Sequence, residues 1–232
     1  MDQPIDDRDA FFRRFAWIIL ITVIVCFGAK ALFDSNGLPP ITPLHHAHAF
    51  TMGAWFVLFA LQPTLIQRGH IGAHQLLGKL SPLLVLSFFF FAAQISLLNW
   101  QRKGFPLIVT ANGINMLLFA GFYLSAIYFR RDSATHKRLM LYASLSIMGP
   151  AFGRLPEIFD LSPVAAVPLI FGYQLAPVVH DRLVEGRVHR ASWIGFGLLF
   201  AAIPLILGLS ESAAWAQWLE GVLGPRGGAP AP

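Results

Sequence analysis

Residues 15–33 read FAWIILITVIVCFGAKALF, an apolar run in which Lys30 is the one charged residue. A membrane-spanning helix needs about 20 consecutive apolar residues, because each residue advances about 1.5 Å through a hydrocarbon core of about 30 Å. Further apolar segments follow at residues 44–66, 75–98, 105–129, 138–158, 163–181 and 191–210. The sequence therefore predicts an all-α protein, a polytopic transmembrane helix bundle of about seven helices.

The composition excludes an ordinary soluble domain. Hydrophobic residues make up 56% of the chain and charged residues 12%, whereas soluble domains carry about 25% charged residues. The net charge of +5 does not indicate nucleic-acid binding, because the basic residues punctuate the apolar segments. A signal peptide is the alternative reading of the first segment. The acidic residues that precede it argue against cleavage, so we expect a retained helix.

Basic residues assign a side of the membrane to each loop. Cytoplasmic loops of membrane proteins are enriched in Lys and Arg. One set of loops carries most of these residues, and the opposite set carries mainly Arg102 and Lys103. The N-terminus is therefore predicted to be cytoplasmic and the C-terminus external. The basic set comprises Arg13, Arg14, Arg68, Lys79, Arg130, Arg131, Lys137, Arg138, Arg182, Arg187 and Arg190.

These assignments divide the chain into three parts. Residues 1–14 form a cytoplasmic N-terminal segment, residues 15–210 the seven-helix transmembrane domain, and residues 211–232 an external tail. The tail holds a short amphipathic stretch with Trp215 and Trp218. Its Gly- and Pro-rich end has a composition typical of disorder, so we expect the tail to be partly disordered.

Histidines open several of the predicted helices at the cytoplasmic face. They are His74, His136 and His189, with His180 at a similar depth. A helix N-terminus disfavours a charged imidazolium, and neutral imidazole is the form that binds metal ions and haem iron. The sequence therefore predicts a cofactor site with His74, His136 and His189 as metal ligands and His180 in reserve. Haem b and a divalent metal are the candidate cofactors.

Simpler explanations of these histidines stay open. An interfacial histidine can hydrogen-bond lipid headgroups, cap a loop, or mark the entry of a helix as Lys and Arg do. No compact metal signature such as HExxH occurs in the chain, and His70 with His74 forms only an HxxxH pair.

A second polar group is predicted near the outer face. His48, Trp55 and Gln62 recur at intervals of seven and so share one face of their helix. Arg154 and Glu157 have the spacing of an i,i+3 ion pair, which we expect His48 to join. Ionisable residues inside a membrane are costly and by default indicate function. The predicted residues for an anionic or quinone-like ligand are His48, Trp55, Gln94, Asn112, Asn115, Arg154 and Glu157.

This group also has alternative explanations. The fifth helix can end at Gly153, which would leave both charges in the outer loop. The amides can serve as interhelical hydrogen bonds, worth about 0.6 kcal/mol each. His45 and His46 are expected in a loop, although their nearness to His48 keeps a small metal site open. Trp55 lies near the middle of its helix, so it must pack inside the bundle or line a cavity.

Several motifs resemble a family of uncharacterised bacterial polytopic inner-membrane proteins. They are HAFTMGAW at residues 48–55, Gln62, residues 69–78, HKRLM at 136–140 and GRVH at 186–189. The resemblance covers most of the chain and implies a multi-pass protein of the bacterial inner (plasma) membrane. A looser similarity connects the chain to oxidase-assembly and cytochrome b561-like membrane proteins, which also place histidines at helix ends. The chain departs from the b561 pattern because it lacks matched histidine pairs at both faces.

Three functions remain as hypotheses. The first is a haem- or metal-binding redox or assembly protein, with a quinone or a respiratory-chain component as partner. The second is a zinc-dependent membrane hydrolase, for which Asp132 and Asp181 are the nearest candidates for a general base. The third is a non-enzymatic transporter or sensor subunit that binds its ligand between His48 and Arg154. Whether the protein is an enzyme stays open at the level of sequence.

Overall fold

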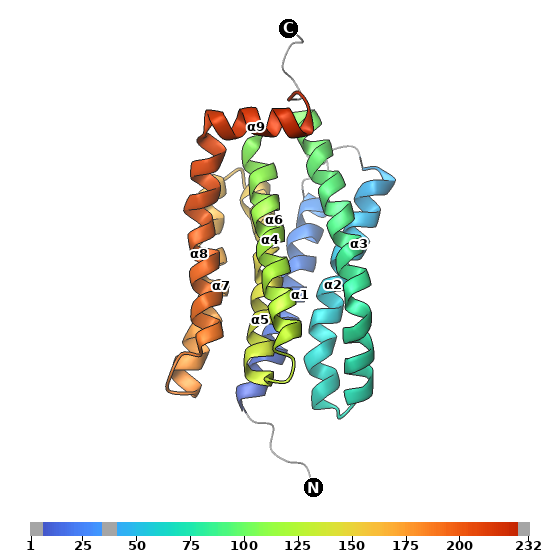
Figure 1. The fold of residues 1–232 in the computed structure, drawn as a ribbon, viewed down its shortest axis with the longest axis vertical. Coiled ribbons are helices and arrows are strands. Elements are labelled where there is room, and N and C mark those ends of the chain that lie inside the picture. The colour runs from blue at the N-terminus through green and yellow to red at the C-terminus, as the bar shows by residue number, and fades with distance from the viewer. Residues whose placement is uncertain (1–6, 34–40, 227–232) are drawn as a thin grey trace.

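The computed structural model describes residues 7–33 and 41–226, and every regular element in these ranges is a helix (Figure 1). In chain order these are α1 (Asp7–Phe33), α2 (Pro43–Gln67), α3 (Ile71–Lys103), α4 (Pro106–Tyr128), α5 (Ser133–Ser146), α6 (Gly149–Ile158), the 3₁₀ turn η2 (Pro163–Ala166), α7 (Val167–Val184), α8 (Arg190–Glu211) and α9 (Ala213–Leu223).

Helices α1, α2, α3, α4 and α8 are each long and apolar enough to cross a membrane. The observed bounds of α2, α4 and α8 match the predicted segments to within one residue at each end. Helix α1 begins before residue 15 and runs back to Asp7, so part of the predicted N-terminal segment is helical. The disorder predicted for the end of the tail concerns residues 227–232, which lie outside the described ranges.

The fifth predicted helix is not one continuous helix. It is divided into α5 and α6 at Ile147 and Met148, directly before Gly149 and Pro150. Proline has no backbone N–H to donate, and its ring clashes with the carbonyl four residues earlier, which here belongs to Ser146. The two short helices follow one another along the height of the bundle (Figure 1).

The sixth predicted helix begins later than expected. The predicted segment starts at residue 163, but the 3₁₀ turn η2 occupies Pro163–Ala166 and α7 starts at Val167. The 18 residues of α7 reach about 27 Å, slightly less than the thickness of a hydrocarbon core. The described structure therefore holds five clear candidate spans, and α5, α6 and α7 make up the remaining part of the bundle.

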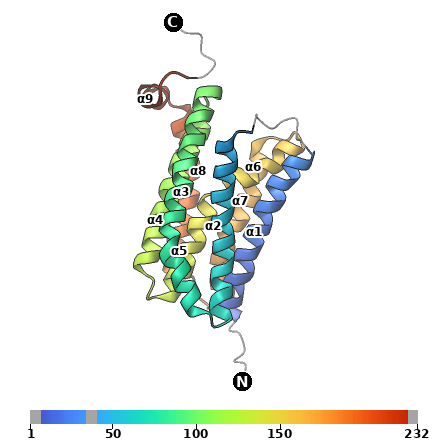
Figure 2. The ribbon, with the colours of Figure 1, turned by 90° about the vertical axis from the view of Figure 1, so that its right-hand side faces the viewer.

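The ends of the helices sort by charge. In Figure 1 the start of α1, the α2–α3 and α4–α5 turns and the α7–α8 turn lie at the lower end, whereas α9 lies across the upper end. The lower end carries the basic set of the sequence. Figure 2 shows α9 end-on, roughly perpendicular to the bundle.

Two tryptophans fasten α9 to the bundle. The indole N–H of Trp215 donates to Thr110 Oγ1 on α4 at 2.7 Å, and that of Trp100 on α3 donates to the Gly224 carbonyl at 2.9 Å. The amphipathic stretch predicted in the tail is thus a helix that bridges α3 and α4 at the upper end.

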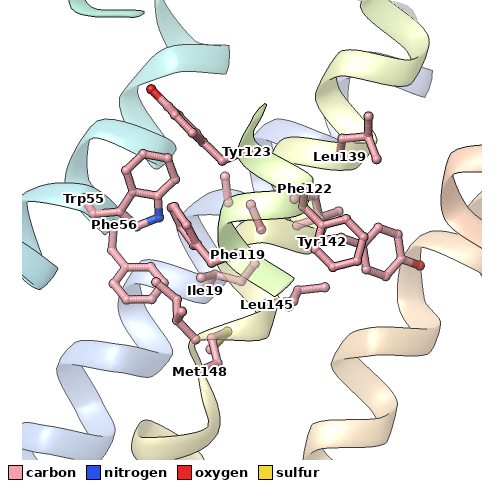
Figure 3. Close-up of a cluster of buried hydrophobic side chains, with 14 of the residues drawn as sticks. Ile19, Trp55, Phe56, Phe119, Phe122, Tyr123, Leu139, Tyr142, Leu145 and Met148 are labelled. Atoms are coloured by element: carbon pink, nitrogen blue, oxygen red, sulfur yellow. The ribbon is translucent and has the colours of Figure 1, made fainter. Parts of the chain in front are cut away.

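Aromatic side chains fill the centre of the bundle (Figure 3). Trp55 on α2 is 3% exposed and packs edge-on against Phe119 and Tyr123 of α4 and Phe88 of α3. Its indole N–H donates to Ser144 Oγ on α5 at 3.3 Å. Trp55 therefore packs inside the bundle, the first of the two positions that its sequence placement allowed.

Candidate functional site

The four predicted cofactor histidines fall into two separate groups at the lower end of the bundle. His74 and His136 lie at the starts of α3 and α5, whereas His189 belongs to a charged network between α5, α7 and α8 and His180 lies beside that network. No three His, Cys, Asp or Glu side chains in the described ranges are grouped as metal ligands would be. The three-histidine cage predicted from the sequence is therefore not assembled in this structure.

His74 and His136 lie in the first turns of α3 and α5, at the same end of the bundle. The ring of His74 lies against the backbone of Gln62 and within electrostatic range of His136. Nδ1 of His136 is 2.8 Å from the Ala126 carbonyl at the end of α4. A carbonyl only accepts, so Nδ1 carries the proton and Nε2 of a neutral ring keeps a lone pair.

Two buried polar atoms at these histidines have no hydrogen-bond partner in the described ranges. Nδ1 of His74 and Oε1 of Gln62 are both buried, and neither has a hydrogen-bond partner within the described part of the chain. Gln62 and His74 flank the α2–α3 turn. Buried polar atoms are normally hydrogen-bonded, so an unsatisfied set is a place where water or a ligand binds.

The charged network is centred on Arg138 and Asp181. Both side chains are fully buried. Nε of Arg138 lies 3.1 Å from each oxygen of Asp181, and Nη2 donates to Asp181 Oδ1 and to Glu185 at 2.5 Å each. Ser192 Oγ on α8 donates to the second Asp181 oxygen at 2.5 Å, and the His189 backbone N–H does so at 3.2 Å. One carboxylate therefore ties α5, α7 and α8 together.

His189 caps α8. Its Nδ1 accepts a hydrogen bond from the Ala191 N–H at 3.1 Å, which requires a neutral ring. Burial lowers the pKa of His189 below its ordinary value, and the nearby Arg138 charge lowers this pKa further. Nδ1 cannot accept the cap hydrogen bond and bind a metal ion at the same time, and Nε2 of the neutral ring carries the proton. His189 therefore acts as a helix cap and not as a ligand.

Asp132 caps α5 in the same way. Its carboxylate accepts from the Ala134 and Thr135 N–H groups at 3.1 and 3.2 Å and from the Thr135 hydroxyl at 2.6 Å. The Thr135 hydroxyl is the main reason that the pKa of Asp132 lies below its ordinary value. Asp132 and Asp181 both use their two oxygens for structural bonds, so neither has the geometry of a general base for metal-bound water.

His180 sits beside the network without joining it by a hydrogen bond. Its Nδ1 is 3.8 Å from Asp181 Oδ1, which is too long for one. The ring stacks on Phe11 of α1, with centroids 4.0 Å apart, and the edge of Phe12 lies beside it.

The outer polar group does form an ion-pair cluster, with a different third member. Arg154 and Glu157 lie on α6, which continues to Ile158 instead of ending at Gly153, and their charged atoms are 3.0 Å apart. The third member is Lys30 of α1, whose ammonium is 3.3 Å from Glu157. Nδ1 of His48, the member expected from the sequence, is buried without a hydrogen-bond partner in the described ranges.

The remaining outer residues do not converge on one site. Asn112 donates to Ser96 Oγ at 2.9 Å, which is the interhelical bond that the sequence left as an alternative. Asn115 lies beside the start of α6, where its Nδ2 is 3.9 Å from the position of a Cβ on Gly149. Gln94 is exposed, and Trp55 belongs to the aromatic core.

The residues that sequence reasoning missed are those of the charged network. Arg138 was assigned to the basic set that marks membrane sidedness, and its burial was not expected. A signal was present, because Asp181 and Glu185 are four residues apart and so share one face of α7. Two carboxylates on one face of a helix near a membrane end require cationic partners.

Comparison with protein-family models, with curated proteins and with solved structures finds no match for this chain. A functional assignment therefore rests on the geometry of its own residues.

Proposed function

We propose that the protein is a membrane-integral haem- or metal-binding protein whose ligands are His74 and His136. The observation that supports this proposal is the placement of His74 and His136 at the starts of α3 and α5, at one end of the bundle, since each has one side of its ring against backbone and a ring nitrogen left for a ligand. A hydrogen bond from the second ring nitrogen to a carbonyl is the usual way in which a metal-ligating histidine is oriented.

The number of ligands favours haem b over a bare ion. Zinc sites in proteins generally take about three or four protein ligands. A haem iron takes only its axial ligands from the protein, because the porphyrin supplies the others. Within the described ranges no third His, Cys, Asp or Glu joins His74 and His136 as a ligand group. Two imidazoles therefore suit a haem iron better than a zinc ion.

The zinc-hydrolase hypothesis is weaker for a further reason. It needs a carboxylate to activate a bound water, and Asp132 and Asp181 are engaged as a helix cap and as the partner of Arg138. We therefore assign the protein to cofactor binding, in a redox or assembly role.

The placement in the membrane belongs to the same proposal. Helix α7 and the stacked pair α5 and α6 complete seven crossings with the five long apolar helices. An odd number of crossings is supported by the start of α1 and by α9, which lie at opposite ends of the bundle in Figure 1. The basic lower end faces the cytoplasm of a bacterial inner membrane by the enrichment of Lys and Arg in cytoplasmic loops.

Absorption spectroscopy with metal analysis on the detergent-purified protein tests the proposal. The protein expressed with a haem supply is expected to show a Soret band and stoichiometric iron. His74→Ala and His136→Asn should both lose the band. Asparagine at position 136 keeps a donor for the Ala126 carbonyl but offers no ligand nitrogen, so the fold around α5 should persist.

His70→Ala is the matched control, because His70 lies at the same end, is exposed and makes no side-chain cap bond. It should retain the cofactor. A well-folded wild-type protein with neither a Soret band nor a bound transition metal would overturn the proposal, as would a His74→Ala protein with unchanged cofactor content.

A further inference from the structure

A groove of about 420 Å³ runs along α7 beside the first turns of α1. Apart from His180, the side chains that line it are apolar, among them Phe11, Leu175 and Val179, and Gly172 leaves part of the wall without a side chain. Leu183, also in the lining, is 78% exposed, so the groove opens sideways at the surface of α7.

His180 is a buried polar group without a partner in this groove. Its side chain is 8% exposed, and neither ring nitrogen has a hydrogen-bond partner in the described part of the chain. The neighbouring carboxylate cannot supply one, because Arg138 and Ser192 already occupy the oxygens of Asp181. An imidazole carries one donor and one acceptor when neutral, and leaving both unmade in a buried position is unfavourable.

The surroundings of His180 restrict what could satisfy it. The lining of the groove contains no Lys, Arg, Asp or Glu, so it offers nothing to neutralise a phosphate or an ammonium headgroup. A neutral head with a hydrogen-bonding carbonyl meets the need of the imidazole. An apolar tail suits the rest of the groove and its sideways opening.

We propose that this groove binds the head of an isoprenoid quinone, with the His180 ring N–H donating a hydrogen bond to a quinone carbonyl. The tail would leave past Val179 and Leu183 into the bilayer. A quinone combines a neutral head that carries carbonyl acceptors with a long hydrocarbon chain, which are the two properties that the groove selects. The proposal concerns binding and does not depend on a cofactor at His74 and His136.

Photolabelling in lipid nanodiscs tests this site. The full-length protein is reconstituted in phosphatidylcholine and phosphatidylglycerol, exposed to an azido-ubiquinone, and the labelled peptides are identified by mass spectrometry. Label is expected on the peptides of α7 and the start of α1. An excess of unlabelled quinone should compete it away.

Two variants remove the site in different ways. His180→Phe keeps an aromatic ring on Phe11 but removes both nitrogens, and Gly172→Leu fills the groove from a position where a Cβ meets nothing within 4 Å. Each should lower the labelling by about tenfold, the effect of roughly one lost hydrogen bond or of a blocked site. His180→Gln, which still donates and accepts, should keep most of it.

Gly197→Leu is the matched control on α8, because a Cβ there also meets nothing within 4 Å and position 197 does not line the groove. It should label like the wild type. Equal labelling of His180→Phe, Gly172→Leu and wild type would overturn the proposal. So would competition by excess phospholipid as strong as that by quinone, which would make the groove a site for ordinary acyl chains.

The outcome is separable from that of the cofactor proposal. His74→Ala should leave the quinone labelling unchanged, and His180→Phe should leave the Soret band unchanged.

Discussion

Arg138 and Asp181 show how strongly position alters the contribution of a single charged residue. Both side chains are fully buried and hydrogen-bonded to each other. Arg154 and Glu157 form a pair of the same chemistry at the other end of the bundle, where both side chains are partly exposed. A buried pair has given up its hydration, so removal of one partner leaves an uncompensated charge. An exposed pair loses little when it is broken, because water replaces the partner.

Asp181→Asn should therefore destabilise the protein by about 3 kcal/mol, the lower end of the cost of breaking a buried pair, because the buried Arg138 loses one carboxylate and keeps only Glu185 as an anionic partner in the described ranges. Thermal unfolding of the purified protein in detergent measures the change. Elution of the variant as a monodisperse species, checked beforehand, shows that it is folded. Arg154→Gln is the matched control, because the half-exposed Glu157 keeps Lys30 as a partner, and its effect should stay within about 0–1 kcal/mol. Similar losses from both substitutions would contradict the buried geometry of the Arg138 network.

His189 adds a pH dependence at the residue scale. Because its pKa in the folded protein is lowered, the unfolded chain takes up a proton at a pH where the folded chain does not. The His189 contribution is therefore fully present above the ordinary histidine pKa of about 6.5 and is lost as the pH falls from there through the lowered pKa. His189→Asn keeps a cap acceptor without this titration.

Melting temperatures at about pH 8 and about pH 5.5 test this expectation. The wild type should lose more stability on acidification than His189→Asn does. An equal loss in both proteins would mean that other histidines carry the whole pH dependence.

At the scale of elements, the contact between α5 and α8 depends on the lack of a side chain at Gly195. A Cβ built there would lie 2.3 Å from Cδ2 of Tyr142, far inside van der Waals contact. Tyr142 is itself fixed, since it is fully buried and its hydroxyl donates to the Gln174 carbonyl of α7 at 3.1 Å. Three helices thus meet at one tyrosine, and the glycine sets how closely α8 approaches.

Gly195→Ala should separate α8 from α5 and destabilise the protein by about 1–3 kcal/mol, the usual cost of overpacking. Thermal unfolding in detergent measures it. Gly197→Ala, on the same helix with nothing within 4 Å of its Cβ, should be close to neutral. A Gly195→Ala protein as stable as Gly197→Ala would show that the two helices do not pack as closely as described.

The whole molecule has one basic end and one end closed by α9. This polarity predicts a fixed orientation in the membrane, with the α2–α3 and α7–α8 turns on the cytoplasmic side and α9 outside. This orientation can be tested with single cysteines in a background that carries Cys26→Ser. The three cysteine variants are Arg68→Cys, Arg187→Cys and Gln217→Cys.

A membrane-impermeant maleimide added to intact cells should label position 217, and positions 68 and 187 should be labelled only after the membrane is opened. Labelling of all three positions from one side would contradict the odd number of crossings.

The sequence alone determined that the chain is all-α with several helices long and apolar enough to cross a membrane, and it placed α2, α4 and α8 almost to the residue. These properties follow from runs of apolar residues and from the charges between them, which act locally along the chain. The Gly149–Pro150 pair that divides α5 from α6 is also a local signal, although one continuous segment was predicted across it. The i,i+3 pair of Arg154 and Glu157 was also readable, because helical spacing alone brings those side chains together.

Only the tertiary structure decided how the histidines are grouped. His74 lies near His136 at the starts of α3 and α5, whereas His180 and His189 lie beside the buried Arg138 and Asp181, although all four were predicted at a similar depth. Depth in a membrane depends on the position of a residue along its own helix. Proximity depends on which helices are neighbours and on how each is rotated about its axis, and those are set by packing between residues far apart in the chain.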